Sequence, residues 1–171
     1  MSIFQINRRT DYALRILIEL AVQADVCLPA REISQRTNVP KAFLHKIMVD
    51  LARAGLIQTQ PGPGGGLLLS VSTNQINMQQ ILEAMEGPIC LNVCLLRPHE
   101  CPRDQICPGH DFWGRLQTTI VQQLRATTLA DLAAEAVQLR QQPRRRDHIP
   151  YVIPGQDVVV NSLPLLRKGE A

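Results

Sequence analysis

The residues with the clearest potential for chemistry lie in the segment CLNVCLLRPHECPRDQICPGH, which holds four of the chain's five cysteines and ends on a histidine. The candidate ligands are Cys94, Cys101, Cys107 and His110, with six, five and two residues between successive members. Thiolates are soft ligands that bind zinc, copper(I) or iron-sulfur clusters, and four such groups complete a site for any of them. The segment is therefore predicted to be a metal-binding loop.

The spacing of these cysteines leaves three kinds of site open. Structural zinc sites favour cysteines two to four residues apart, and the three wider-spaced cysteines form no such pair. Prolines follow Cys101 and Cys107, as in ferredoxin-type runs that end on Cys-Pro. An iron-sulfur cluster and zinc are therefore equal hypotheses, followed by a thiol–disulfide switch. Cys90 is open to packing or ligation, and Cys27 is interpreted as an ordinary packing residue.

Length and composition limit the class of protein that can carry this loop. With 171 residues, 45% of them apolar, the chain supports one core with an appended element. It has no run of about 18 uncharged apolar residues, so we expect a cytoplasmic, nucleoid-associated protein without a membrane partner. Thiols stay reduced in that compartment. Because the chain has no Cys-x-x-Cys motif, phosphate-binding glycine loop or acid–base pair, neither enzyme activity nor a small-molecule substrate is expected.

A helix, a tight turn and a second helix are predicted near the N-terminus, after a first amphipathic helix over about 10–24 with Thr10 as its possible cap. The segment AREISQRTN forms the first member of the pair, and KAFLHKIMVDLARAG forms the second. The break at Val39-Pro40 separates them, and Gly55 ends the second helix. This order is typical of a helix-turn-helix DNA-binding unit.

The exposed side of the KAFLHKIMVDLARAG helix is predicted to be polar and basic. Lys41, Lys46 and Arg53 can reach phosphates, while Ala42 and His45 are small or polar enough to meet base edges. The first sixty residues carry eight Lys or Arg against five Asp or Glu, so the basic excess lies in this half of the chain. The pattern indicates double-stranded promoter DNA as the partner. A solvated basic helix in another three-helix domain is the alternative.

Two short apolar runs, LIQTQ and LLLSV, follow this helix and are joined by PGPGGG. Glycines permit the positive φ angles of a sharp hairpin, so these runs predict a two-stranded wing with Gly64 and Gly65 near DNA. A wing lies beside the DNA backbone or in the minor groove. It favours the DNA-binding interpretation, because a plain helical domain has little use for such a hairpin.

The rest of the chain predicts helices for dimerisation. QINMQQILEAMEG is predicted to form an amphipathic helix before the loop. After the loop, apolar residues recur at four-residue steps from Phe112 to Leu124, which predicts a second helix. Thr128 with Asp131 resembles a cap for a further helix. Their wide apolar stripe suits a homodimer. The predicted fold class is mainly α with a small β-wing, divided into a winged helix-turn-helix over 1–73, a linker helix and cysteine loop over 74–110, dimerisation helices over 111–140 and a flexible tail over 141–171.

Taken together, these segments resemble a known family. The segments that carry this resemblance are TDYALRIL, the helix-turn-helix, the GPGGG of the wing, LEAMEG, the loop of three cysteines and TTLADL. The chain resembles the bacterial iron-sulfur transcription regulators of the IscR, NsrR and RirA type. The resemblance covers roughly residues 1–140. It implies a homodimeric winged-helix regulator in which each loop holds an iron-sulfur cluster. Cluster state, as a readout of iron-sulfur status, redox state or nitric oxide, would set affinity for promoter DNA.

The resemblance also implies a set of ligands. Cys94, Cys101 and Cys107 match the three cysteine ligands of the family. IscR-like members add a histidine three residues after the last cysteine, which His110 matches, and hold a [2Fe-2S] cluster. NsrR-like members use the aspartate of the T-D-Y segment of the partner subunit, which Asp11 matches, and hold a [4Fe-4S] cluster. His110 and two irons are favoured, because His110 is local to the loop and an aspartate suits a helix N-terminus.

Overall fold

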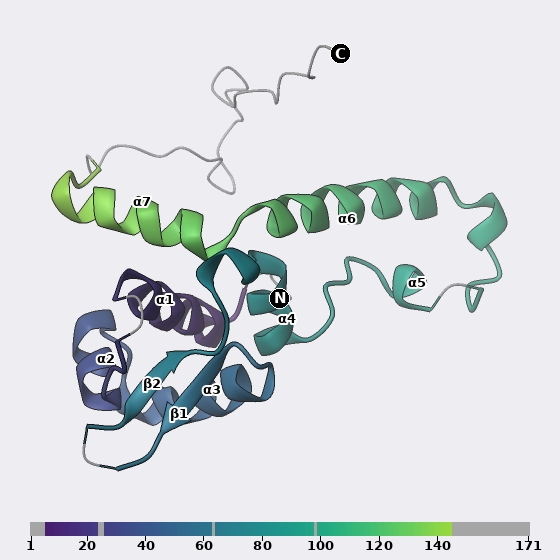
Figure 1. Cartoon of the computed structure of the whole chain (residues 1–171). Helices are drawn as coiled ribbons and strands as arrows, with labels where there is room; N and C mark the ends of the chain where they lie inside the picture. Colours follow the sequence, from purple (N-terminus) through teal and green to yellow (C-terminus); the bar gives the residue numbers. More distant parts are fainter. Residues whose placement is uncertain (1–5, 24–25, 63, 98, 145–171) are drawn as a thin grey trace. The chain divides into compact units, whose positions relative to one another are not determined.

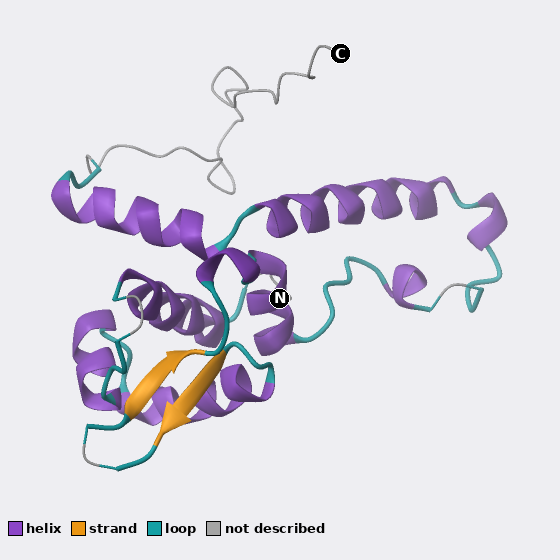
Figure 2. Ribbon diagram, viewed as in Figure 1, coloured by secondary structure: helices purple, strands orange, loops and turns teal. Residues whose placement is uncertain are grey.

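The computed structural model describes residues 6–23, 26–62, 64–97 and 99–144, and it is mainly helical with one two-stranded sheet (Figure 2). The features discussed below lie within the first of two units, Met1–Val137. In chain order (Figure 1) the elements are α1 (Arg8–Val22), α2 (Ala30–Thr37), α3 (Lys41–Arg53), β1 (Ile57–Gln60), β2 (Gly66–Leu69), the 3₁₀ turn η1 (Thr73–Gln75), α4 (Met78–Glu86), α5 (Val93–Leu96), the 3₁₀ turn η2 (Asp104–Ile106), α6 (Pro108–Ala126) and α7 (Leu129–Gln141).

The first helix begins earlier than the sequence predicted. Asn7 is its N-cap, and the Asn7 side-chain oxygen accepts a hydrogen bond from the backbone N–H of Arg9 at 3.0 Å. Thr10 was the expected cap, but it is buried inside the first turn and donates its hydroxyl to the Glu86 carboxylate. The prediction was wrong because asparagine is at least as good a cap as threonine and stands three residues earlier.

The turn between α2 and α3 is built from residues that cannot continue a helix. Asn38 adopts the left-handed conformation, with φ 54° and ψ 29°, which asparagine tolerates better than most residues. Pro40 then occupies the N-cap of α3, where the absence of an N–H has no cost. The Ser34 hydroxyl donates to the Val39 carbonyl at 2.8 Å and fastens the turn. The predicted helix-turn-helix is confirmed.

The wing is an antiparallel pair in which Ile57 lies opposite Leu69 and Gln60 lies opposite Gly66. A third segment joins it, because Leu28 and Leu67 exchange backbone hydrogen bonds of 2.9 and 2.8 Å. A Cβ built on Gly66 would overlap the carbonyl of Leu28. This glycine is therefore required by the close approach of two backbones. The fold class, mainly α with a small wing, is confirmed.

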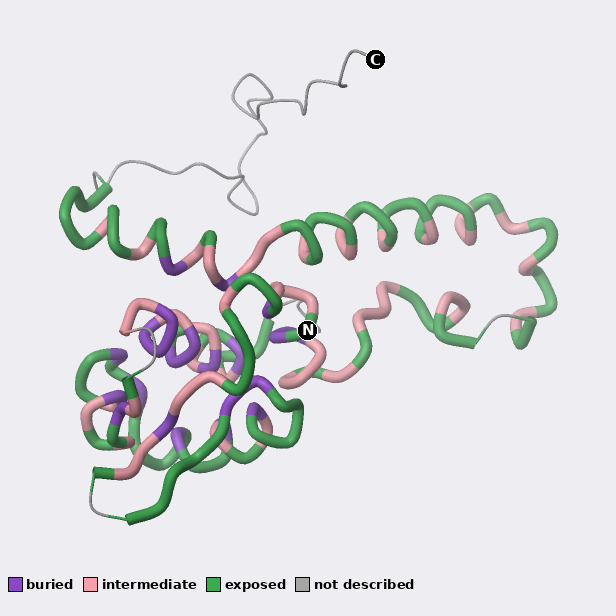
Figure 3. The backbone as a smooth tube through the Cα atoms, viewed as in Figure 1, coloured by how far each residue is buried: buried purple, intermediate pink, exposed green. Residues whose placement is uncertain are grey.

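A single core joins the helices to the wing and extends past the cysteine loop. Its fully buried members include Ile16, Ile47, Leu67 and Ile81, and Leu129 of α7 belongs to the same cluster. The segment before α7 is tied to the start of α4 by two backbone hydrogen bonds, Met78 N–H to Thr127 O at 3.0 Å and Leu129 N–H to Ile76 O at 2.8 Å. The first turns of α7 thus belong to the winged-helix core (Figure 3).

The long helix α6 has a different environment, because none of its nineteen residues is buried. Phe112 is 51% exposed, and Trp113 and Leu116 are each 37% exposed. The apolar stripe that the sequence predicted is therefore left largely uncovered by this chain (Figure 3). Among the described residues, no helix has both the length and the apolar character needed to cross a membrane.

Candidate nucleic-acid interface and cysteine loop

Helix α3 separates its core residues from its predicted DNA contacts. Leu44, Ile47 and Leu51 are buried against the other helices. The predicted contact residues are all exposed: Lys41, Ala42, His45, Lys46 and Arg53. Because residues three and four positions apart share a helix face, the exposed residues form one surface of basic, polar and small side chains. That surface has the composition required for phosphate and base-edge contacts.

One carboxylate lies at the edge of this surface. Asp50 Oδ1 is 3.5 Å from Arg53 Nη1, and the Arg53 side chain remains 76% exposed. The other oxygen of Asp50 accepts from Arg9 in α1. The Asp50 carboxylate is thus shared between Arg53 and the neighbouring helix, and the long contact leaves most of the Arg53 side chain exposed.

The predicted wing residues lie at the end of the hairpin. Gly64 is exposed with φ +82°, and Gly65 is half-buried. A Cβ on Gly65 would overlap the carbonyl of Gln60, so the chain can fold back on itself only with glycine there. The strands and tip, IQTQPGPGGGLLL, contain no lysine or arginine. Contacts from this wing would therefore come from backbone and amide groups instead of cations.

The four predicted ligands of the cysteine loop lie on two helices and on the segment between them. Cys94 lies in α5, Cys101 precedes η2, Cys107 is the N-cap of α6 and His110 is in the first turn of α6. The three thiols are half-buried and unpaired. Within the described part of the chain, no three His, Cys, Asp or Glu side chains are grouped closely enough to hold a metal ion. The loop supplies the donors without gathering them.

His110 carries an unsatisfied buried atom. Its Nδ1 lies 3.3 Å from Asp104 Oδ1, which is within ion-pair distance. The geometry nevertheless makes no hydrogen bond, and the buried Nδ1 has no other partner among the described residues. A buried polar atom without a partner is costly, and an imidazole in that position is available to a ligand. Three thiols and this imidazole fit the donor set of an iron-sulfur site.

Asp11, the alternative fourth ligand, is occupied locally. Its carboxylate pairs with Arg15 Nη2 at 2.7 Å, one turn further along α1. The Asp11 side chain is about half exposed and lies in the first turn of the helix, where a negative charge is favourable. This pairing agrees with the helix-terminal role that the sequence suggested for Asp11.

Cys90 lies apart from the other three loop thiols. Its Sγ donates to the Asn92 carbonyl at 2.9 Å, and it lines a cavity of about 200 Å³ together with residues from α4 and from the segment before α1. The cavity is lined by Ile6, Leu82, Glu86, Gly87, Pro88, Ile89, Cys90 and Leu91. A packing role for Cys90 is favoured by these apolar neighbours.

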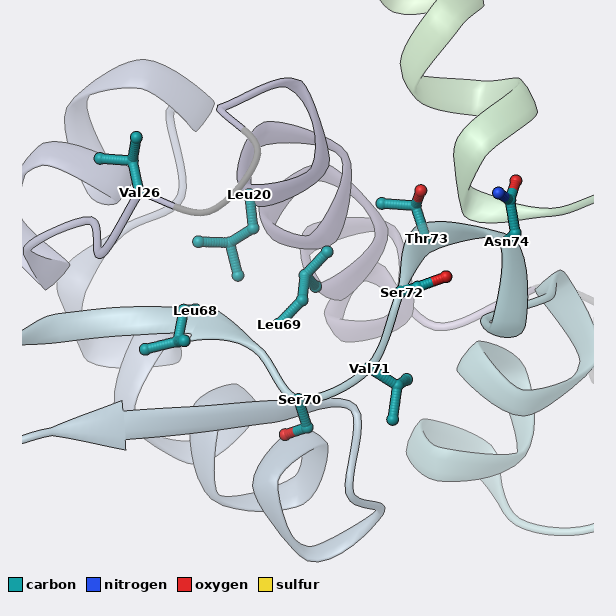
Figure 4. Close-up of a pocket in the computed structure, with 9 residues that line it drawn as sticks. All are labelled: Leu20, Val26, Leu68, Leu69, Ser70, Val71, Ser72, Thr73 and Asn74. Atoms are coloured by element: carbon teal, nitrogen blue, oxygen red, sulfur yellow. The ribbon is translucent and has the colours of Figure 1, made fainter.

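A larger pocket of about 510 Å³ lies between the end of α1 and the segment after β2 (Figure 4). Leu20 and Leu69 line it together with a hydroxyl-rich run from Ser70 to Thr73. In Figure 4, Ser70 points away from Thr73, so the polar groups do not converge on one point. Convergent polar groups are what fix a small ligand in a pocket, and this pocket does not provide them.

Two contacts near the site were not found by sequence reasoning. Arg9 in α1 pairs with Asp50 in α3, and Glu86 at the end of α4 accepts from Thr10. Their partners lie 41 and 76 residues apart in the sequence. Helical periodicity relates residues three or four positions apart and carries no signal for such pairs.

Comparison with known proteins identifies related sequences and structures. Residues 6–135 match the model of the Rrf2 family, described as an iron-dependent transcriptional regulator. A predicted HTH-type transcriptional regulator of Aquifex aeolicus (strain VF5) is 32% identical over 123 residues, covering 71% of this chain and 85% of that protein.

Two solved structures share the fold. CymR, described as the global cysteine regulator of B. subtilis, matches with a TM-score of 0.66 and 28% identity, covering 78% of this chain and 98% of that one. IscR of T. potens matches with a TM-score of 0.63, covering 83% of this chain and 93% of that one. At 19% identity the likeness to IscR supports the fold alone.

Proposed function

Because the chain belongs to the Rrf2 family of iron-dependent transcriptional regulators, we propose that it is a homodimeric DNA-binding regulator whose cysteine loop holds an iron-sulfur cluster. Its partner is double-stranded promoter DNA, and iron-sulfur status, redox state or nitric oxide is the signal. The observation that carries the DNA-binding part is the exposed basic and polar face of α3, opposite the buried Leu44, Ile47 and Leu51.

DNA binding divides between the two parts of the winged helix. Lys41, Lys46 and Arg53 contact phosphates, which gives affinity that depends on salt, while Ala42 and His45 face base edges in the major groove. The wing lies over the backbone or minor groove. Because it carries no cation, it adds position and shape recognition with little counterion release.

Dimerisation is assigned to α6. Its exposed apolar side chains, Phe112, Trp113 and Leu116 among them, form a stripe that a second copy of the helix can cover. Two recognition helices related by a two-fold axis read half-sites about one helical turn apart. A change in the separation of those helices therefore changes affinity for the whole site.

The cluster is assigned to Cys94, Cys101, Cys107 and His110, and we favour a [2Fe-2S] cluster. When bound, such a cluster supplies a reversible one-electron redox centre that also reacts with nitric oxide. The Nδ1 of His110, which makes no hydrogen bond, and the Arg15 pairing of Asp11 support histidine as the fourth ligand. Two alternatives for the loop are a [4Fe-4S] cluster that uses Asp11 and a structural zinc ion.

Anaerobic purification with absorption spectroscopy and iron and sulfide analysis tests this assignment. We expect a two-iron spectrum that His110→Ala abolishes and Asp11→Ala preserves. A four-iron spectrum that is lost in Asp11→Ala and kept in His110→Ala would move the assignment to the [4Fe-4S] cluster that uses Asp11. A colourless protein that contains stoichiometric zinc after anaerobic purification would exclude a resident cluster.

A further inference from the structure

Glu86, the last residue of α4, is bonded to the start of α1. One of its carboxylate oxygens, Oε1, accepts a hydrogen bond from the backbone N–H of Asn7 at 3.0 Å. The same oxygen accepts from the hydroxyl of Thr10, a residue that is only 3% exposed. Asn7 is the N-cap of α1. A single oxygen at the end of α4 therefore fixes both the cap and the first turn of α1.

The first turn of α1 is in turn bonded to the recognition helix. Arg9 uses one nitrogen, Nη2, to pair with the carboxylate of Asp50 in α3. The Nε of Arg9 is buried and has no hydrogen-bond partner among the described residues, so the guanidinium binds Asp50 through Nη2 alone. A second contact runs in parallel, because the rings of Tyr12 and Phe43 meet edge to face with centroids 5.6 Å apart.

The cysteine loop starts directly after Glu86. Gly87 has φ +86°, a conformation that other residues rarely adopt, so the chain changes direction at this position. The following residues, up to Leu91, border the cavity of about 200 Å³ that they share with Ile6, the neighbour of the cap Asn7. The cavity on this side of Glu86 leaves the loop room to shift relative to α1.

We propose that Glu86 and Arg9 are positioning residues that connect the cysteine loop to the recognition helix. Glu86 fixes the start of α1, and Arg9 couples the position of α1 to that of α3 through its contact with Asp50. A movement of the loop that displaces the end of α4 at Gly87 would therefore change the position of α3 relative to DNA. The inference deepens the proposed function and rests on it for the DNA readout, but its first test requires neither DNA nor a cluster.

Backbone hydrogen exchange of the full-length protein provides that first test. Glu86→Gln removes the charge but keeps the side-chain length, so the hydrogen bonds to α1 weaken without a cavity. We expect exchange to become about tenfold faster in the first turn of α1 and in α3, the loss of roughly one charged hydrogen bond. The matched control is Glu83→Gln, because the hydrogen bond that its side chain accepts comes from Gln79 inside α4. Unchanged exchange in α3 of the Glu86→Gln protein would overturn the proposal.

DNA binding tests whether Arg9 positions α3 or contacts DNA itself, with a duplex selected from a random library as the probe. Arg9→Ala should weaken specific binding about tenfold and leave the salt dependence of binding unchanged, because Arg9 touches Asp50 and no phosphate. Arg9→Lys should restore most of the affinity, since only one arm of the guanidinium is used. A fall of about one unit in the salt slope of Arg9→Ala would show a direct phosphate contact and reject the positioning role.

A double variant tests whether the two residues act in one chain of contacts. In Glu86→Gln/Arg9→Ala the loss of affinity should equal the larger single loss, because both changes break the same connection. Losses that multiply would show two independent effects and overturn the proposal. If the wild-type protein selects no duplex at all, the proposed DNA-binding function fails, and the exchange experiment still decides for or against the connection between α4 and α3.

Discussion

Ile47 in α3 and Ile106 in the cysteine loop are the same residue type in opposite environments. Ile47 is completely buried, whereas Ile106 is 73% exposed. The contrast holds for the two regions as a whole, because the winged-helix core contains nearly all the buried residues, and the described parts of α5, η2 and α6 contain none. The winged helix is held by its own packing.

The cysteine loop lacks that source of order. Val93, Leu96 and Ile106 are each more than half exposed, and Cys94, Cys101 and Cys107 lie beside them as free thiols. Exposed apolar groups and unpaired donors of this kind are typical of surfaces that bind a ligand or a second protein chain. The geometry of the winged helix is therefore set by its packed core, whereas the conformation of the cysteine loop is not set by packing.

The sharpest test of this contrast concerns the thiols. Cys94→Ala, Cys101→Ala and Cys107→Ala should each abolish a brown chromophore, because loss of one ligand opens the cluster to solvent and release. Cys27→Ala and Cys90→Ala, which retain the three ligands, serve as controls and should keep the full iron and sulfide content. Full iron and sulfide content in any of the three ligand variants would remove that residue from the proposed site.

The next largest effect is expected for the two isoleucines. Ile47→Ala should lower the free energy of unfolding by about 2–5 kcal/mol, since it leaves a cavity in a packed core. Ile106→Ala should change it by less than about 0.5 kcal/mol, because the side chain is mostly in water already. Urea denaturation of the two metal-free variants measures both values. Similar losses in the two variants would show that the loop has a packed core of its own.

A smaller effect is expected on DNA affinity from single contacts on α3. Lys46→Ala should weaken binding by a similar factor for all sequences and reduce the salt slope by about one unit. His45→Ala should relax the preference at one base pair and leave the slope unchanged. Binding isotherms at several salt concentrations separate the two outcomes. If Lys46→Ala changed sequence preference at constant slope, α3 would have to be oriented differently on DNA.

The sequence predicted the winged helix well because its signals are local. Pro40 and Gly55 mark the two ends of α3, and the apolar spacing of Leu44 and Ile47 sets its buried face. It failed at Thr10, whose role depends on Glu86, 76 residues away. Long-range pairs of this kind are determined by how the helices pack, and the periodicity of apolar residues does not predict which helices pack together.

In the cysteine loop the sequence predicted the chemistry but not the geometry. The ligand types and spacing of the loop could be read from the sequence, but the short helix α5 that carries Cys94 was not predicted. The positions of the ligands relative to one another could not be predicted, because no buried residue of α5 or η2 restrains them. The donor set can be read from the residue types, whereas its geometry depends on packing that this loop does not supply.

The smallest predicted effect concerns the cap that ties α7 to the winged-helix core. The Asp131 carboxylate accepts from the Thr128 hydroxyl at 2.6 Å and from the Thr128 N–H at 2.9 Å, and these hydrogen bonds hold the pKa of Asp131 below its usual value of 3.8. Because the folded pKa is depressed, the carboxylate stabilises the fold above pH 3.8, and that contribution is lost as the pH falls through the folded pKa.

Asp131→Asn should therefore lower the melting temperature slightly at pH 7, and the difference from wild type should disappear in strong acid. The change should speed hydrogen exchange at the start of α7 and leave exchange in the cysteine loop unaltered, since Leu129 packs in the core and not on the loop. Faster exchange in the loop of this variant would mean that the two regions share one folding unit, and the contrast between them would not hold.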